Sequence, residues 1–244
     1  MLRNTHSSFA VFFVLLILRF TLYAGNENQV KAPELIENQP RISGEVFNFH
    51  MQADGSQYLY DYWVKGDVYL IDGSVIRGEL FKYNAYLDEL IWLHPLSFKP
   101  VQAEKDFVEG FTLFPLDGDT LFFNHVTIKP WYENEPLKLY AQELYEGQHI
   151  SLVVQRRIKR TGETLKSSGA RIIATPIIEP DPVFFVVFDD GEARDIKRMT
   201  RRAVAAVFPE TQKEIRSLLR QEGIRINDQN DLVKAIMLID TRLK

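Results

Sequence analysis

The sequence predicts an α+β protein that is mainly β, an antiparallel meander that forms a barrel or two packed sheets and is closed by C-terminal helices. Short runs of β-branched and aromatic residues recur along the middle of the chain, with turn residues between them. After residue 197 the apolar residues recur at helical spacing instead. The turn spacing implies about nine to eleven strands, and an open sheet of that length would curl or split.

The clearest local signal is a hairpin within Trp63–Leu93, centred on Asp72-Gly73. Asp-Gly readily adopts the two positive φ values of a type I′ turn. With these two residues as the loop, we expect Leu70 to face Val75 and Tyr69 to face Ile76.

The other strands follow from similar runs between turn residues. We expect them at Glu79–Tyr83, Glu89–Leu93, Phe98–Ala103, Phe107–Phe114, Thr120–Ile128, Leu137–Tyr145, His149–Ile158, Val183–Phe188 and Ala193–Ile196. Leu137–Tyr145 also fits helical spacing, so helix remains the alternative there. Tyr58–Trp63 is either a first strand or an irregular lead-in. Thr161–Pro182, rich in glycine, serine and proline, is expected to be a long loop.

Three helices are expected at the C-terminal end. The first spans Thr200–Phe208, and Pro209 opens the second at the turn where proline is tolerated. Gly223 ends that helix in a left-handed conformation, and Asp228 or Asn227 caps the third. The predicted organisation is a signal peptide (1–24), a flexible linker (25–41), an antiparallel β domain (42–197) and a helical segment (198–244).

The N-terminal residues have the pattern of a secretory signal peptide. Arg3 provides the positive charge, residues 9–18 are uninterrupted apolar residues, and Ala24 offers a cleavage point. An uncleaved membrane anchor is the alternative, because Leu22 is larger than the residue usually found near a cleavage site. Arg19 interrupts the apolar run, however, which favours the signal peptide and therefore a periplasmic or secreted protein.

Composition excludes several classes of site. The chain has no cysteine, so it has no disulfides, thiol catalysis or thiolate metal ligands. Residues 25–150 carry 9 Lys and Arg against 20 Asp and Glu, whereas residues 151–244 carry 18 against 13. This asymmetry indicates either a basic binding face or solvated helix surfaces. Nucleic acid is not an expected partner of an acidic, exported chain.

No catalytic or metal-binding motif is recognisable. The histidines His50, His94, His125 and His149 stand singly, without metal-ligand spacing. Neither a serine nucleophile elbow nor a phosphate-binding glycine loop is present. We therefore expect no cofactor and no metal site, and we lean against an enzyme.

Acidic and aromatic residues leave one alternative open. The pairs Asp88-Glu89, Asp117-Gly118-Asp119 and Asp189-Asp190 are better explained by turns, although two opposed carboxylates would suit a glycosidase. Among the many aromatic residues, the notable ones are Tyr58, Tyr60, Tyr62, Trp63, Trp92, Trp131 and Tyr132. In strands such residues usually fill a core, whereas an exposed row would suit stacking on sugars.

Two basic groups are the candidate binding residues. The first comprises Arg156, Arg157, Lys159 and Arg160, and the second comprises Arg198, Arg201 and Arg202, preceded by Arg194 and Lys197. They suit anionic lipid headgroups, polysaccharide or an acidic protein, and solvated surface is the alternative.

Several short motifs occur together along the chain. They are Gly66-Asp67-Val68, Asp72-Gly73, Tyr83-Asn84, Asp88-Glu89-Leu90, Asp106-Phe107-Val108, Gly110-Phe111, Leu144-Tyr145-Glu146-Gly147, Ile150-Ser151-Leu152, FPETQKEIRSLL and LVKAIMLID. In this combination the chain resembles a family of uncharacterised exported proteins of Bacteroidota-type Gram-negative bacteria, over about Trp63 to Leu243. The resemblance implies an envelope location and a β-rich domain with a helical tail, and no activity. Thr161–Pro182 is longer than expected for such proteins.

Together these observations lead to the hypothesis of a non-enzymatic envelope protein that binds other envelope proteins or anionic envelope components. Its signal segment would contact the membrane, transiently or permanently. The alternative hypothesis is a carbohydrate-binding or carbohydrate-active periplasmic protein.

Overall fold

The fold is mainly β with three α-helices at its C-terminal end, which confirms the predicted class. It is described by a computed structural model covering residues 42–132, 135–168 and 171–242. The predicted signal peptide (1–24) and linker (25–41) lie outside the described residues. Within those described ranges, no helix is long and apolar enough to cross a membrane.

The strands are β1 (Gly44–Val46), β2 (Val64–Leu70), β3 (Val75–Asn84), β4 (Glu89–Leu93), β5 (Pro100–Ala103), β6 (Val108–Phe114), β7 (Leu121–Pro130), β8 (Leu137–Glu146), β9 (Ile150–Gln155), β10 (Ile158–Ser168), β11 (Arg171–Pro180), β12 (Val183–Phe188) and β13 (Glu192–Asp195). A 3-10 turn, η1 (Lys105–Phe107), precedes β6. The helices are α2 (Arg201–Ala206), α3 (Gln212–Gln221) and α4 (Gln229–Asp240).

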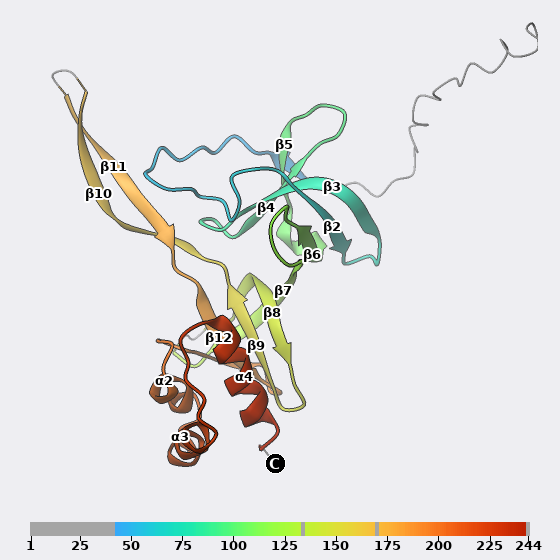
Figure 1. Cartoon of the computed structure of the whole chain (residues 1–244). Coiled ribbons are helices and arrows are strands. Elements are labelled where there is room, and N and C mark those ends of the chain that lie inside the picture. The colour runs from blue at the N-terminus through green and yellow to red at the C-terminus, as the bar shows by residue number, and fades with distance from the viewer. Residues whose placement is uncertain (1–41, 133–134, 169–170, 243–244) are drawn as a thin grey trace, which may run out of the picture. The chain divides into compact units, whose positions relative to one another are not determined.

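Five strands close into a barrel in the order β7-β13-β12-β9-β8, because β8 also pairs with β7 (Figure 1). Four of these pairings are antiparallel, whereas β13 runs parallel to β7. Through its first residues, 121–124, β7 also pairs with β6 and so continues into a curved sheet with the order β6-β2-β3-β4-β5-β1. A barrel is therefore the outcome of the predicted choice between a barrel and packed sheets, with an extended sheet attached.

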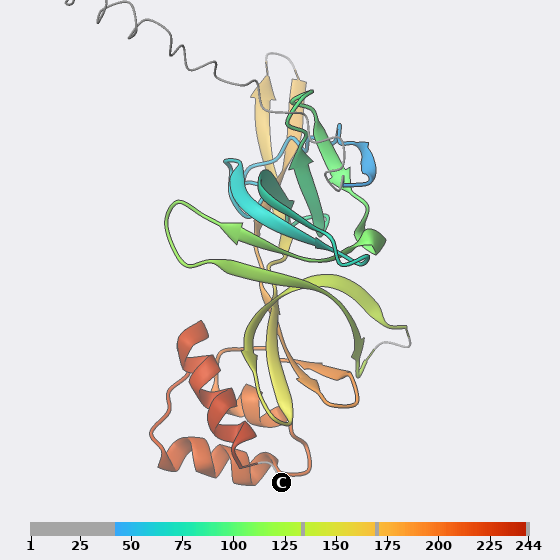
Figure 2. The same cartoon turned by 90° about the vertical axis from the view of Figure 1, so that its right-hand side faces the viewer.

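Successive side chains of the barrel strands point to opposite faces, and the two faces belong to two different apolar cores. Val153 of β9 and Phe185 of β12 belong to a core built from the five barrel strands. Their neighbours Leu152 and Val186 point the opposite way and belong to a core that they share with residues of α2, α3 and α4. Figure 2 shows these three helices gathered beside the barrel strands. Because both faces of β9 and β12 are covered, these strands are almost continuously apolar in sequence. A third core lies under the curved sheet.

Two of the predicted helix ends are confirmed and one differs, because α3 begins at Gln212 and not at Pro209. The hydroxyl of Thr200 accepts a hydrogen bond from Ala203 N–H at the start of α2, and Asp228 accepts one from Asp231 N–H at the start of α4. Gly223 has φ 67° after α3, as expected for a left-handed end. The predictions for Asp228 and Gly223 are thereby confirmed, and the Thr200 cap is an addition that the structure makes.

The last helical residue of α4, Asp240, anchors this helix to the turn between β8 and β9. Its carboxylate accepts hydrogen bonds from the backbone N–H groups of Gln148, His149 and Ile150, at 2.8, 2.9 and 3.1 Å, and from the Tyr145 hydroxyl at 2.9 Å. Asp240 is only 5% exposed. We call this arrangement the α4 anchor.

The opening hairpin forms at Asp72-Gly73, but its predicted register is wrong by one residue. Tyr69 pairs with Val75 rather than with Ile76. Gly73 N–H bonds to Leu70 C=O, and Gly73 alone takes a positive φ, 82°. The loop is therefore a type I turn followed by a left-handed glycine, a common three-residue hairpin connection that shifts the pairing.

Two other predictions are settled by tertiary pairing. Thr161–Pro182 is not a long loop, because most of it belongs to the two-stranded hairpin of β10 and β11. Leu137–Tyr145 is a strand, since β8 pairs with both β7 and β9. Tyr58–Trp63 is an irregular lead-in that makes one isolated bridge, between Tyr58 and Asn84.

Candidate functional site

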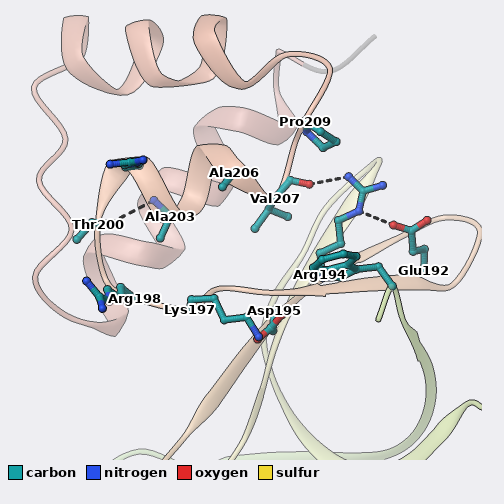
Figure 3. A pocket seen from close by; sticks show the side chains of 12 residues that line it. Glu192, Arg194, Asp195, Lys197, Arg198, Thr200, Ala203, Ala206, Val207 and Pro209 are labelled. Carbon is teal, nitrogen blue, oxygen red and sulfur yellow. Dashed lines mark hydrogen bonds and ion pairs between the residues drawn. The ribbon is translucent and has the colours of Figure 1, made fainter. Parts of the chain in front are cut away.

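A cavity of about 900 Å³ lies between β13, the segment after it and α2. Figure 3 shows side chains from these elements facing the same space. The lining residues are Trp131, Glu192, Arg194, Asp195, Lys197, Arg198, Thr200, Arg202, Ala203, Ala206, Val207 and Pro209. Its size lies within the range of small-molecule sites. We call it the β13–α2 pocket.

The pocket combines an apolar wall with an excess of positive charge. Alanine, valine and proline side chains from α2 and the residues after it form the wall. Four basic residues, Arg194, Lys197, Arg198 and Arg202, outnumber the acidic Glu192 and Asp195. This combination suits a ligand that is anionic on one side and apolar on another.

Two of the basic side chains are held by neighbours. The guanidinium group of Arg194 bonds to Glu192, donates a hydrogen bond to Val207 C=O at 2.7 Å, and lies 5.1 Å from the centre of the Phe188 ring. Lys197 pairs with Asp195, and its Nζ lies 4.9 Å from the centre of the Tyr132 ring. These contacts fix one wall of the pocket and commit two of its charges.

The other two basic side chains are uncommitted. Arg198 and Arg202 are both exposed, and neither forms an ion pair with a carboxylate elsewhere in the described part of the chain. A guanidinium group presents a planar fork of N–H donors that matches carboxylate and phosphate oxygens. Arg198 and Arg202 are therefore the groups available to bind an anion in this pocket.

Asp195 adds an acceptor with spare capacity. Its side chain is 8% exposed, and one oxygen pairs with Lys197. The other oxygen, Oδ1, is buried and has no hydrogen-bond partner among residues 42–132, 135–168 and 171–242. A buried acceptor without a partner costs free energy, so a ligand hydroxyl or amide that donates to it would be stabilised.

An exposed aromatic pair completes the pocket rim. Trp131 is 64% exposed and lines the pocket, and its ring meets that of Tyr132 edge to face at 5.8 Å. The parallel pairing of Ala193 with Pro130 brings Trp131 beside β13. Its open face can stack on a flat or sugar-like group.

The first predicted basic group does not form a binding surface. Arg156 donates to the side-chain oxygens of Gln142 and Gln229, both at 2.7 Å, and so ties β8 to the start of α4. Burial lowers the pKa of Arg156. Arg157 and Lys159 both pair with Asp181.

Two further candidates are likewise committed to neighbours. Arg160 pairs with Glu163, and Arg201 donates to Ile224 C=O. Of the two basic groups predicted from sequence, Arg198 and Arg202, with the preceding Arg194 and Lys197, line the pocket.

The predicted carboxylate pairs stay in separate turns. Asp190 accepts a hydrogen bond from Glu192 N–H, which is turn chemistry. Asp117 and Asp119 flank Gly118, whose φ is 119°. No pair faces another across the β13–α2 pocket, because none of these residues lines it. The glycosidase arrangement thus has no support from these residues.

Asp88 has a structural role beyond its turn. It adopts a φ of 58° and accepts hydrogen bonds from Tyr83 Oη at 2.5 Å and Lys105 Nζ at 2.7 Å. Burial, followed by the Asp88 charge, raises the pKa of Tyr83. Asp88 therefore joins β3, the β3–β4 turn and η1.

A second cavity of about 640 Å³ lies beside β1 and β5 and is lined in part by Glu89, Glu104 and Lys105. Burial raises the pKa of Glu89, and its Oε2 has no hydrogen-bond partner among the residues described. However, Lys105 is committed to Asp88, and Glu104 accepts from the Ser43 hydroxyl at 3.2 Å. This cavity offers fewer uncommitted groups than the β13–α2 pocket.

The histidines serve local structure. His94 accepts hydrogen bonds from the N–H groups of Leu96 and Ser97, both at 3.2 Å, and so shapes its own turn. His125 Nδ1 contacts Val108 C=O at 3.2 Å, and burial lowers its pKa. No group of three His, Asp or Glu side chains that could hold a metal ion occurs within the described residues.

In comparisons with known proteins, no family model, curated protein or solved structure matches the chain.

The sequence indicated part of this site and missed the rest. It singled out the basic cluster on Arg198 and Arg202 and included Trp131 among the aromatic residues. Asp195 was missed, because an isolated Asp at the end of a strand carries no local signal. Its position after Arg194 in a strand ending beside a basic run is the only hint the sequence contains.

Proposed function

We propose that this protein is a non-enzymatic binding module that holds an acidic saccharide in the β13–α2 pocket. The supporting observation is that one cavity contains two arginines without an ion-pair partner among the described residues, Arg198 and Arg202, beside the exposed ring of Trp131. The arginines would bind the carboxylate or phosphate of the sugar, and Trp131 would stack on its ring.

The acceptor on Asp195 favours a hydroxylated ligand over a simple anion. Its free Oδ1 would take a hydrogen bond from a sugar hydroxyl, while Lys197 keeps the other oxygen occupied. An anion without hydroxyl groups would leave Oδ1 unsatisfied. This arrangement unites the two hypotheses from sequence, because an acidic saccharide is both an anionic envelope component and a carbohydrate.

The envelope location is part of the proposal. Arg3, the apolar residues 9–18 and Ala24 support export through a signal peptide. Expression in a Gram-negative host, followed by mass measurement of the periplasmic protein, tests this point. We expect the mass of a chain that begins at Gly25, and retention of the intact chain in the membrane would contradict cleavage.

Binding is tested with the purified protein and matched acidic and neutral oligosaccharides, first on a glycan array and then by calorimetry. Replacing both Arg198 and Arg202 by alanine should weaken binding of the acidic ligand about 100-fold or more, because hydrogen bonds to charged groups contribute about 1.5–3 kcal/mol each. Trp131→Ala should weaken it about tenfold. Asp195→Asn should reduce discrimination between the ligand and its deoxy analogues.

The matched control removes two other exposed arginines, Arg216 and Arg220 of α3, which do not line the pocket. This variant has the same change of net charge and should bind as the unaltered protein does. Equal binding of neutral and acidic sugars would contradict the proposal. So would equal weakening by the control variant, or failure to bind any acidic saccharide at millimolar concentration.

A further inference from the structure

The hairpin of β10 and β11 forms a sheet of its own, separate from the eleven-stranded sheet (Figure 1). Its base is anchored: Ile158 and Ile178 belong to the core under the curved sheet, and Ile178 N–H bonds to Asp54 C=O at 2.9 Å. Pro176 C=O accepts a hydrogen bond from Asp54 N–H at 2.8 Å, and beyond Glu163 and Pro176 the two strands pair only with each other in the described chain. A two-stranded ribbon by itself is marginally stable in water.

The free part of the hairpin exposes large apolar side chains within regular strands. Leu165 is 69% exposed, Ile172 is 75% exposed and Ile173 is 50% exposed. Single exposed apolar residues are ordinary on protein surfaces, but here three lie within a few paired positions. We call Leu165, Ile172 and Ile173 the apolar tip.

The register places the apolar tip on both faces of the ribbon. Leu165 pairs with Ala174, and Ser167 pairs with Ile172, so Leu165 and Ile172 share one face. Ile173 is the next residue along β11 and therefore lies on the opposite face. A docked protein would cover one face of the ribbon, whereas a lipid interface surrounds both.

The ribbon edges oppose pairing with a second copy of the chain. A register shift between Arg160 and Gly162 marks a bulge in β10, and β11 carries Pro176. Bulges, proline and basic residues on an edge are devices that prevent strands of two molecules from joining. The apolar tip is thus not explained by edge-to-edge dimerisation.

The charge of this region matches an anionic surface. Residues 164–175 include Lys166 and Arg171 and contain no acidic residue. The basic residues nearer the base are neutralised by carboxylates, as in the pair of Arg160 with Glu163. Apolar residues in a segment whose charged residues are all basic are the combination that binds anionic membrane interfaces.

We propose that the apolar tip of the β10–β11 hairpin docks the protein onto an anionic phospholipid bilayer. The docking is shallow, because the unpaired strand edges require hydrogen-bond partners that the hydrocarbon layer lacks. The tip side chains enter the interface while the backbone stays among headgroups and water. This surface is distinct from the β13–α2 pocket, which no hairpin residue lines.

The chain has no cysteine, so a single introduced cysteine reports on one position. Ala174→Cys, exposed and paired with Leu165, is labelled with an environment-sensitive dye; Ser217→Cys on α3 is the matched control. Vesicles of equal parts phosphatidylglycerol and phosphatidylcholine should shift the emission of the Ala174 dye to the blue. Pure phosphatidylcholine should not, and the Ser217 dye should not respond to either. Because the readout is local, it is independent of any contact that the N-terminal segment makes with lipid.

Two sets of substitutions then separate charge from apolar burial. Lys166→Gln with Arg171→Gln should raise the lipid concentration needed for half of the emission shift about 30-fold, since each basic residue contributes roughly fivefold. Replacing Leu165, Ile172 and Ile173 by serine should weaken it roughly 100-fold or more. Serine at Leu96, Phe98 and Leu116, also exposed, should have no effect.

Three results would overturn the proposal. One is an Ala174 dye that does not respond to the anionic vesicles. Another is an equal response to both vesicle types. The third is a shift that appears without lipid as protein concentration rises, because that would assign the tip to a second copy of the chain.

Discussion

Asp240→Asn should destabilise the protein by about 3 kcal/mol, because it disrupts the α4 anchor. The carboxylate is 5% exposed and accepts four hydrogen bonds. Asparagine can keep the two bonds on the Oδ1 side, from His149 and Ile150. Its NH₂ group then replaces Oδ2; the Tyr145 hydroxyl can turn to accept from it, but the Gln148 N–H donor loses its acceptor. One charge-assisted bond, about 1.5–3 kcal/mol, is lost, and the two that remain lose their charge assistance.

Asp228→Asn at the other end of α4 is the matched control. Asp228 accepts a single capping bond from Asp231 N–H at 2.8 Å, and asparagine caps helices as well as aspartate does. Urea unfolding at neutral pH, followed by circular dichroism, should therefore show a lower midpoint for Asp240→Asn and a change within about 0.5 kcal/mol for Asp228→Asn.

The effect of Asp240→Asn should also depend on pH. Burial raises the pKa of Asp240, but the N–H groups of Gln148 and His149, with the Tyr145 hydroxyl and Ile150 N–H, together hold it below its usual 3.8. A folded-state pKa below the unfolded value stabilises the fold at higher pH, and this contribution is lost as pH falls through the folded pKa. The gap between the unaltered protein and Asp240→Asn should thus be full at neutral pH and shrink in acid. Coincident midpoints at neutral pH, or a gap that stays constant down to the pH where both proteins unfold, would refute this reasoning.

Three further changes probe other parts of the fold, each by urea unfolding. Gly147→Ala should lower the free energy of unfolding by about 2–3 kcal/mol, because its Cβ would lie 2.4 Å from the Asp240 carboxylate oxygen of the α4 anchor. Gly223→Ala has open space around it but a φ of 67°, so it should lower the free energy of unfolding by only about 1–2 kcal/mol. Phe185→Ala inside the barrel should lower the free energy of unfolding by about 3–5 kcal/mol. The Phe122 side chain is 56% exposed, so Phe122→Ala should change it by less than about 1 kcal/mol. Similar losses for the two variants would contradict the assignment of Phe185 to the barrel interior. Arg156→Met should cost about 1–3 kcal/mol through its lost bonds to two glutamines, and a loss of saccharide binding at unchanged stability would show that its role is not structural.

The features that short-range chemistry decides could be predicted from the sequence. The Asp72-Gly73 turn, the capping residue Asp228 and the left-handed Gly223 each depend on a few neighbouring residues. Strands β9 and β12 could be predicted because both faces of each strand are buried, so most of their residues are apolar.

The hairpin of β10 and β11 was not predictable in the same way. Its strands lack a buried face beyond their base, so their apolar residues do not alternate with polar ones as in a half-buried strand. Glycine, serine and proline in the same segment favour turns. Local signals therefore predicted a loop where the structure has paired strands.

By itself, the sequence determined that the chain is β-rich and has a helical C-terminal segment. It also determined the positions of most strands and of several turns and helix ends, since these features follow from local conformational preference. Only the tertiary structure decided that β13 joins β7 in parallel and closes the barrel. That non-local pairing also brings Trp131 beside Arg198 and Arg202, more than sixty positions later in the chain. The β13–α2 pocket is a product of barrel closure, which no stretch of neighbouring residues encodes.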